Sequence, residues 1–99
     1  MEKVFRYSVK AIIIKGNKLL VESCDYGRGR YCKLPGGGNQ WGETMTEALI
    51  RECKEELSLD VKPVRLVLAR DYIAKNHNQT IDLDCFHQAE LMFECSVSD

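Results

Sequence analysis

The alternation of apolar and polar residues predicts strands in the first third of the chain. Phe5–Ile14 is rich in β-branched and aromatic residues, which favour strands. A polar turn at Lys15–Lys18 separates it from a second short strand, Leu19–Glu22, so that the two form a hairpin. A third short strand is predicted at Tyr31–Leu34. The sequence PGGG that follows is expected to end regular structure.

A helical period replaces the alternation in the middle of the chain. Apolar residues recur at every fourth position from Met45 to Leu57, which is the spacing of one buried helix face. Thr44 and Glu47 have the spacing of a capping box, the side-chain pattern that begins many helices. The sequence therefore predicts a helix at Thr44–Ser58.

Strands are predicted again after the helix. Val61–Ile73 forms one strand, Lys75–Thr80 is a loop, and Ile81–Val97 is one long strand or a strand pair with a bend. The element order β-β-β-α-β-β describes a single mixed α/β domain over residues 1–99. One helix covers only one face of a sheet, while alternation puts apolar side chains on both faces. An exposed apolar face of this kind would favour a homodimer or a higher assembly, unless the chain is a fragment of a longer protein.

Composition and charge narrow the class of protein. Apolar residues make up 44% of the chain and charged residues 29%, which is typical of a soluble globular domain. A net charge of −1 gives no basic field for polymeric nucleic acid. Five cysteines without a C-x-x-C pair indicate reduced thiols, and neither a signal peptide nor a membrane span is visible. We therefore expect a cytoplasmic protein that does not bind membranes.

Three carboxylates near the end of the predicted helix stand out chemically. Glu52, Glu55 and Glu56 fall on one face, where like charges repel and the helix dipole is also unfavourable. Hard oxygen ligands suit Mg²⁺ or Mn²⁺, which would remove both penalties. The alternative is an ordinary solvated helix face, in which Arg51 forms an i,i+4 ladder with Glu47 and Glu55.

A longer pattern connects these carboxylates to the glycine-rich loop. Gly37 is followed by Glu43, then by Arg51 with Glu52, and then by the pair Glu55 and Glu56. Over residues 37–59 this spacing resembles the signature of the Nudix hydrolases. Cys53 stands where that family has a bulkier apolar residue. Ser58 stands where the family has glycine, which argues against a left-handed exit from the helix.

The resemblance implies a fold and an activity. The fold would be a Nudix-like α/β/α sandwich with a mixed sheet, in which the second helix is missing because the chain is short at its C-terminus. The activity would be Mg²⁺-dependent hydrolysis of the pyrophosphate bond of a nucleoside diphosphate linked to another group. The alternative is a nucleotide-binding module with the same fold and little or no turnover, or a truncated fragment. The residues that mark particular substrates in the family are absent, so no substrate is named.

The resemblance also assigns roles to residues. Glu55 and Glu56 would be the principal metal ligands, Glu52 a further ligand or the catalytic base, and the Gly36 carbonyl an extra ligand. The catalytic residues would thus be Glu52 and Glu55. Gly37, Glu43 and Arg51 would be structural, with Glu43 and Arg51 holding the loop against the helix.

Other candidates lie outside the signature, and each has a plainer alternative. Arg28, Arg30 and Lys33 could contact substrate phosphates, or they could belong to a solvated loop. Trp41 could stack on a base or simply pack, and His77 and His87 could be acid–base groups or ordinary surface or core residues. The family often has a further acidic ligand in a later segment, for which Glu90 or Glu94 would be an imperfect substitute.

Overall fold

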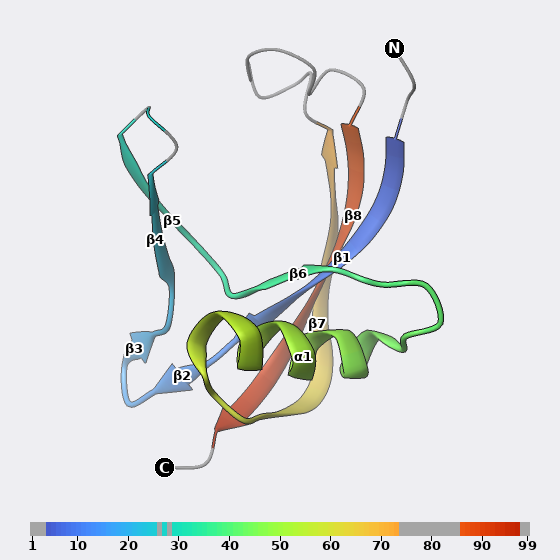
Figure 1. Ribbon diagram of the computed structural model, residues 1–99. Coiled ribbons are helices and arrows are strands. Elements are labelled where there is room, and N and C mark those ends of the chain that lie inside the picture. Colours follow the sequence, from blue (N-terminus) through green and yellow to red (C-terminus); the bar gives the residue numbers. More distant parts are fainter. Residues whose placement is uncertain (1–3, 26, 28, 74–85, 98–99) are drawn as a thin grey trace.

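A four-stranded mixed sheet forms the centre of the molecule in a computed structural model that describes residues 4–25, 27, 29–73 and 86–97. The strand order is β6-β1-β8-β7 (Figure 1). These strands are β1 (Val4–Ile12), β6 (Gly36–Gly38), β7 (Val61–Ile73) and β8 (Phe86–Val97). β1 pairs in parallel with β8 and antiparallel with β6, while β7 pairs antiparallel with β8. The predicted mixed α/β class is confirmed.

Two small hairpins connect β1 to β6. The first consists of β2 (Ile14–Lys15) and β3 (Lys18–Leu19). The second consists of β4 (Glu22–Asp25) and β5 (Arg30–Lys33), and Figure 1 shows it standing apart from the central sheet. The predicted strand at Phe5–Ile14 is therefore interrupted at Ile13, and the predicted strand at Leu19–Glu22 is divided between two hairpins.

The glycine run continues regular structure, contrary to the sequence-based expectation. Gly36–Gly38 forms β6 and pairs with β1 at the edge of the sheet. A side chain at Gly36 would collide with the carbonyl oxygen of Val9, and the φ of Gly36 is +141°. Glycine is therefore needed here to bring the two backbones together rather than to end the strand.

The helix α1 (Met45–Leu57) begins as predicted and ends in a way that was not predicted. The Thr44 side chain accepts a hydrogen bond from the Glu47 N–H, and the Glu47 side chain accepts one from the Thr44 N–H, which confirms the capping box. Ser58 has a left-handed conformation with φ 57°, so the expectation against a left-handed exit is wrong. Such a conformation costs a non-glycine residue about 1–2 kcal/mol. Two backbone bonds help to offset this cost, one from Ser58 N–H to the Lys54 carbonyl and one from Leu59 N–H to the Cys53 carbonyl.

The hydrophobic core lies between α1 and one face of the sheet (Figure 1). The predicted helical stripe is buried at Leu49 and Cys53, whereas Met45 at its start is exposed. The buried core cluster comprises Val9, Ala11, Ile13, Ala48, Leu49, Cys53, Val61, Phe93 and Cys95. Burial raises the pKa of Cys53 to about 12 and that of Cys95 to about 11, so both side chains remain neutral thiols.

The opposite face of the sheet carries both polar and apolar side chains. Alternation along β1 directs Ser8, Lys10 and Ile12 to this face. Glu90 of β8 pairs with Ser8 in register and is also buried. The expectation of an apolar far face therefore holds only in part, because polar residues occupy much of its centre. The predicted loop at 75–80, and residues 81–85 of the predicted last strand, lie outside the described residues.

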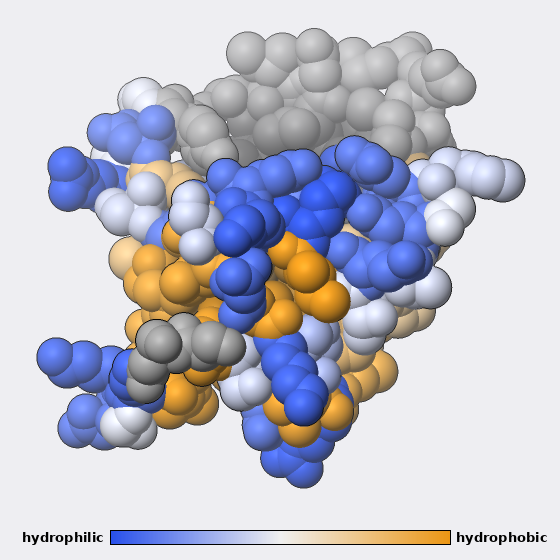
Figure 2. Space-filling model, turned by 60° about the horizontal axis from the view of Figure 1, so that its bottom comes forward, coloured by the Kyte–Doolittle hydropathy of each residue, from blue (hydrophilic) through white to orange (hydrophobic). Residues whose placement is uncertain are grey.

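A groove of about 570 Å³ opens at the end of the sheet where β8 finishes. It is lined by the β1–β2 junction together with the nearby ends of β7 and β8. Figure 2 shows apolar side chains exposed between hydrophilic ones in the view of this end. Among the described residues α1 is the only helix, and it is too short and too polar to cross a membrane.

Candidate functional site

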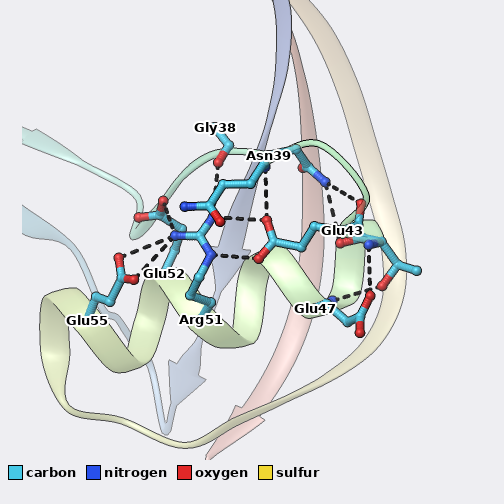
Figure 3. Close-up of polar contacts among 9 residues, drawn as sticks. Gly38, Asn39, Glu43, Glu47, Arg51, Glu52 and Glu55 are labelled. Atoms are coloured by element: carbon cyan, nitrogen blue, oxygen red, sulfur yellow. Dashed lines mark hydrogen bonds and ion pairs between the residues drawn. The ribbon is translucent and has the colours of Figure 1, made fainter.

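The guanidinium group of Arg51 is the centre of the polar contacts between α1 and the glycine loop (Figure 3). Its Nε donates to Glu43 Oε2 at 2.6 Å and its Nη2 donates to Glu43 Oε1 at 3.0 Å, which is a bidentate pair. Nη2 also donates to the Gly38 carbonyl at 3.2 Å. Arg51 therefore ties α1 to the loop and to the end of β6.

The same guanidinium reaches two of the three predicted metal-binding carboxylates. Arg51 Nη1 donates to Glu52 Oε1 at 3.0 Å and to Glu55 Oε2 at 3.3 Å. These contacts raise the pKa of Arg51, to which Glu43 contributes most, so the guanidinium remains charged. The repulsion inferred from the sequence is therefore partly offset by a cation of the chain itself.

Glu43 is held from both sides. In addition to Arg51, the Gln40 backbone N–H donates to Glu43 Oε1 at 3.0 Å. The hydrogen bonds from Arg51 and then from Gln40 lower the pKa of Glu43, so it is a stable anion near neutral pH. The Asn39 side chain also donates to the Glu43 carbonyl at 3.1 Å, which fixes the loop directly before the helix cap. Neither Asn39 nor Gln40 was predicted from the sequence, because neither is a fixed position of the signature.

Two carboxylates lie beside consecutive glycines of β6. The Glu56 Oε1 atom accepts a hydrogen bond from the Gly36 N–H at 3.0 Å, and Glu56 Oε2 lies 3.8 Å from Lys33 Nζ. The Glu52 carboxylate lies over Gly37, where a Cβ atom would be only 2.7 Å from it. Gly36 and Gly37 thus form a cradle that a side chain would fill.

The donor set fits a hard divalent cation, although the carboxylates do not converge in this conformation. Within the described part of the chain, no three carboxylate, thiol or imidazole groups lie close enough together to share a metal ion. The Glu55 side chain is 59% exposed and turned toward Arg51, while Glu52 and Glu56 flank the glycine cradle. All of these ligands are oxygens, which is the chemistry that Mg²⁺ and Mn²⁺ prefer.

A comparison with protein-family models decides the family. The model of the NUDIX domain matches residues 4–98, which is nearly the whole chain. The chain belongs to the Nudix family. A comparison with curated proteins finds no match.

Solved Nudix structures share the fold over almost all of this chain. The crystal structure of a UDP-X diphosphatase has a TM-score of 0.72 at 26% identity and covers 100% of this chain and 45% of its own. A NUDIX hydrolase from Nitrosomonas europaea has a TM-score of 0.78 at 21% identity, and the match covers 95% of this chain and 60% of that protein. A MutT protein from Methanosarcina mazei Go1 has a TM-score of 0.76 at 21% identity, and the match covers 100% of this chain and 69% of that protein. The chain therefore has a Nudix-like α/β fold and spans about half to two thirds of these relatives.

The remaining predicted residues of this Nudix domain lie in several places. Lys33 joins the site, because it approaches both Glu56 and, at 3.7 Å, Glu22. Arg30 is exposed at the start of β5, and Trp41 is 100% exposed, so it does not pack against the domain. Arg28 and His77 lie outside the described residues.

The other candidates lie on β8, away from the helix carboxylates. His87 Nε2 is 3.1 Å from Asp71 Oδ1, and the His87 ring contacts Phe5 edge-on. Glu90 is hydrogen-bonded to Arg70 and Glu94 to Arg65 on the far face of the sheet. None of these contacts brings β8 side chains to the glycine cradle.

A substitution at Gly37 tests whether the cradle positions Glu52. Gly37→Ala is compatible with the backbone, because the φ of Gly37 is not positive, but its methyl group would displace the Glu52 carboxylate. We expect kcat to fall by about tenfold or more, with a melting temperature close to that of the wild type. Steady-state kinetics and thermal melts measure the two effects. Unchanged turnover in Gly37→Ala would show that Glu52 does not act from this position.

Proposed function

We propose that this Nudix domain hydrolyses the pyrophosphate bond of a nucleoside diphosphate linked to another group, with Mg²⁺ or Mn²⁺ as cofactor. The observation that carries the proposal is the position of Glu52 and Glu56 on the two glycines of the cradle, directly beside the edge of the sheet. Two proteins of similar structure are named for reactions of this kind, which supports the proposal. They are a UDP-X diphosphatase and an ADP-ribose pyrophosphatase from Streptococcus suis.

Different residues of the chain would have different roles in such a reaction. Glu52, Glu55, Glu56 and the Gly36 carbonyl would hold the cation, which when bound supplies charge neutralisation at phosphorus and an activated water. Glu52 is either a further ligand or the base that accepts the proton of that water. Arg51 and Glu43 position these carboxylates by fixing α1 to the loop.

The groups that would contact the substrate lie on the side of β5. Lys33 is already beside Glu56, so its ammonium group can contact a phosphate oxygen of the substrate. Arg30 lies at the exposed start of the same strand, within the hairpin that stands apart from the sheet (Figure 1). We assign both to substrate phosphates, together with Arg28.

The second candidate function is a nucleotide-binding module with little or no turnover. One observation favours it: Arg51 holds Glu55 by hydrogen bonds, and the three carboxylates do not converge. As a metal ligand, Glu55 would have to release Arg51, whereas binding through Lys33 and the glycine cradle leaves this contact in place.

The proposed partners are small molecules, and polymeric nucleic acid and membranes are not among them. A net charge of −1 provides no extended basic surface for a nucleic-acid backbone. We propose a cytoplasmic location, where Cys53 and Cys95 would remain thiols. A homodimer remains part of the proposal, and light scattering after size exclusion measures the mass.

A combined metal and substrate experiment tests the proposed function. Mg²⁺ or Mn²⁺ should raise the melting temperature, because a ligand that binds only the native state stabilises it. The double variant Glu55→Gln, Glu56→Gln should lose this rise, whereas Glu94→Gln should keep it. A panel of nucleotides and nucleotide sugars, assayed for phosphate and nucleoside monophosphate, then identifies the substrate. Metal and nucleotide binding without any product would favour the binding module.

A further inference from the structure

A strip of polar side chains crosses the face of the sheet opposite α1. Neighbouring residues of β1 and β8 pair in register along it, with Arg6 beside Gln88 and Ser8 beside Glu90. Gln88 and Glu90 are 5% and 6% exposed. Polar side chains at this depth normally have hydrogen-bond partners. A polar group of this strip that has no hydrogen-bond partner therefore needs an explanation.

Most members of the strip do have partners. Arg6 Nε donates to Gln88 Oε1 at 2.8 Å, and Gln88 Nε2 donates to Glu90 Oε2 at 2.8 Å. Arg70 Nε, from β7, donates to the other oxygen of Glu90 at 2.7 Å. The charge of Glu90 is thus balanced by Arg70, and both of its oxygens accept hydrogen bonds.

Lys10 is different from the other members. It lies on the same face of β1 and is partly buried, which lowers its pKa. No hydrogen bond or ion pair within the described residues involves its ammonium group. The charges that act on it are those of Glu90 and Glu56 and, in the opposite direction, of Lys33 and Arg6. Lys10 therefore lies between the strip and the glycine cradle without bonding to a carboxylate of either.

Ser8 provides a second, independent observation. It is fully buried, and its Oγ atom has no hydrogen-bond partner in the described structure. Ser8 lies two residues before Lys10 on the same face, since side chains in a strand alternate. A hydroxyl donor and an ammonium donor are therefore both unpartnered on one side of one strand. Leaving a buried hydroxyl unpaired is unfavourable, which points to a missing acceptor.

The position of Lys10 connects this pair to the proposed reaction. Lys10 is in register with Gly36, whose N–H donates to Glu56. Glu56 already accepts this bond and faces Lys33, so Lys10 is not needed as its counter-ion. Among the described residues, the pair formed by the Lys10 ammonium and the Ser8 hydroxyl is therefore left without an acceptor. Its complement is an anion that can accept hydrogen bonds from both an ammonium and a hydroxyl group.

We propose that Lys10 and Ser8 form an anion subsite for a phosphate group of the substrate other than the two joined by the cleaved bond. This inference rests on the proposed function and narrows its substrate class. The group linked to the nucleoside diphosphate would carry a further phosphate, as in a nucleoside triphosphate or a phosphorylated sugar. Neutral glycosyl groups would leave the Lys10 charge and the Ser8 hydroxyl unsatisfied and would be poorer substrates.

The subsite is tested directly with inorganic phosphate and no metal. Titration followed by amide NMR should shift the resonances of β1 and β6 in the wild-type protein. Lys10→Met should weaken phosphate binding by about tenfold or more, the loss expected for one charge-assisted hydrogen bond. Lys10→Arg should retain binding, and Lys62→Met is a control at an exposed lysine of β7. Shifts located elsewhere, or equal affinities for wild type and Lys10→Met, would overturn the subsite.

A matched substrate pair tests whether the phosphate belongs to the substrate. The panel of nucleotides described above identifies the preferred nucleobase. The value of kcat/KM is then measured for the nucleoside triphosphate and the nucleoside diphosphate with that base. Lys10→Met should lower the value for the triphosphate about tenfold while changing the diphosphate little. Equal losses for both would contradict the assignment and indicate a structural role. If the wild type hydrolyses nothing, the proposed function fails, while the metal-free phosphate titration still decides the subsite.

Discussion

Replacing Glu52 by Gln is expected to lower kcat by about 10²–10⁴-fold, the contribution typical of a general acid or base. The carboxylate lies over Gly37 and is hydrogen-bonded only to the adjacent Arg51 among the described residues, so its removal leaves the core untouched. The melting temperature should therefore stay close to that of the wild type. Steady-state kinetics at saturating Mg²⁺ measure the loss.

The matched control for this substitution is Glu47→Gln on the same helix. Glutamine at this position keeps the capping box, because either side chain can accept the Thr44 N–H. Metal titrations of Glu52→Gln then separate its two possible roles. A kcat loss at unchanged metal affinity identifies Glu52 as the base, and a parallel loss of metal affinity identifies it as a ligand. A decrease in kcat of less than about tenfold would assign the base elsewhere.

Arg51→Ala is expected to weaken metal binding by about 10–100-fold, the usual effect of removing a group that orients metal ligands. Arg51 contacts Glu43, Glu52 and Glu55 as well as the Gly38 carbonyl, so its loss affects both the loop and the carboxylates (Figure 3). The side chain is only 22% exposed, and several of its acceptors would lose their donor. We expect the melting temperature, the metal affinity and substrate binding to fall together.

The pH dependence of this destabilisation follows from Glu43. Arg51 and Gln40 lower the folded-state pKa of Glu43. The Arg51–Glu43 pair therefore stabilises the native state fully at pH values above the unfolded-state pKa of Glu43, which is near 4.5. This contribution is lost as the pH falls through the lower folded-state pKa. The difference in melting temperature between wild type and Arg51→Ala should thus be largest near neutral pH and decrease below pH 4.5.

Arg51→Lys is the informative companion variant. Lysine keeps the charge but cannot make the bidentate contact with Glu43, so it should restore only part of the melting temperature. A turnover defect in Arg51→Ala with normal metal affinity and a normal melting temperature would contradict its positioning role.

The parts of the fold that depend on local sequence were predictable. Thr44 and Glu47 predict the start of α1 because a capping box involves only the first turn. Leu49 and Cys53 predict its buried face because the helical period fixes which side chains share a side. The contact between Arg51 and Glu43 was expected from the family resemblance and is present in the structure.

The parts that depend on distant residues were not predictable in the same way. Gly36–Gly38 becomes a strand only because β1 offers its edge, and three glycines carry no strand signal of their own. The left-handed Ser58 reflects backbone hydrogen bonds that a residue type does not reveal. The polar strip follows from the register between β1 and β8, which brings Ser8 to Glu90. A sequence pattern shows that Ser8 and Lys10 share a face but not which residues they meet.

The parallel pairing of β1 with β8 has a consequence for how the domain folds. The Arg6–Gln88 hydrogen bond joins positions 82 residues apart, and the two strands are the central pair of the sheet. Closing so long a loop costs chain entropy before any core contact compensates for it, so folding should be slow for a domain of this size. During synthesis β1 must remain without its central partner until β8 leaves the ribosome. The exposed strand would be vulnerable to aggregation in that interval, so chaperones would have most influence on the yield of folded protein at this stage.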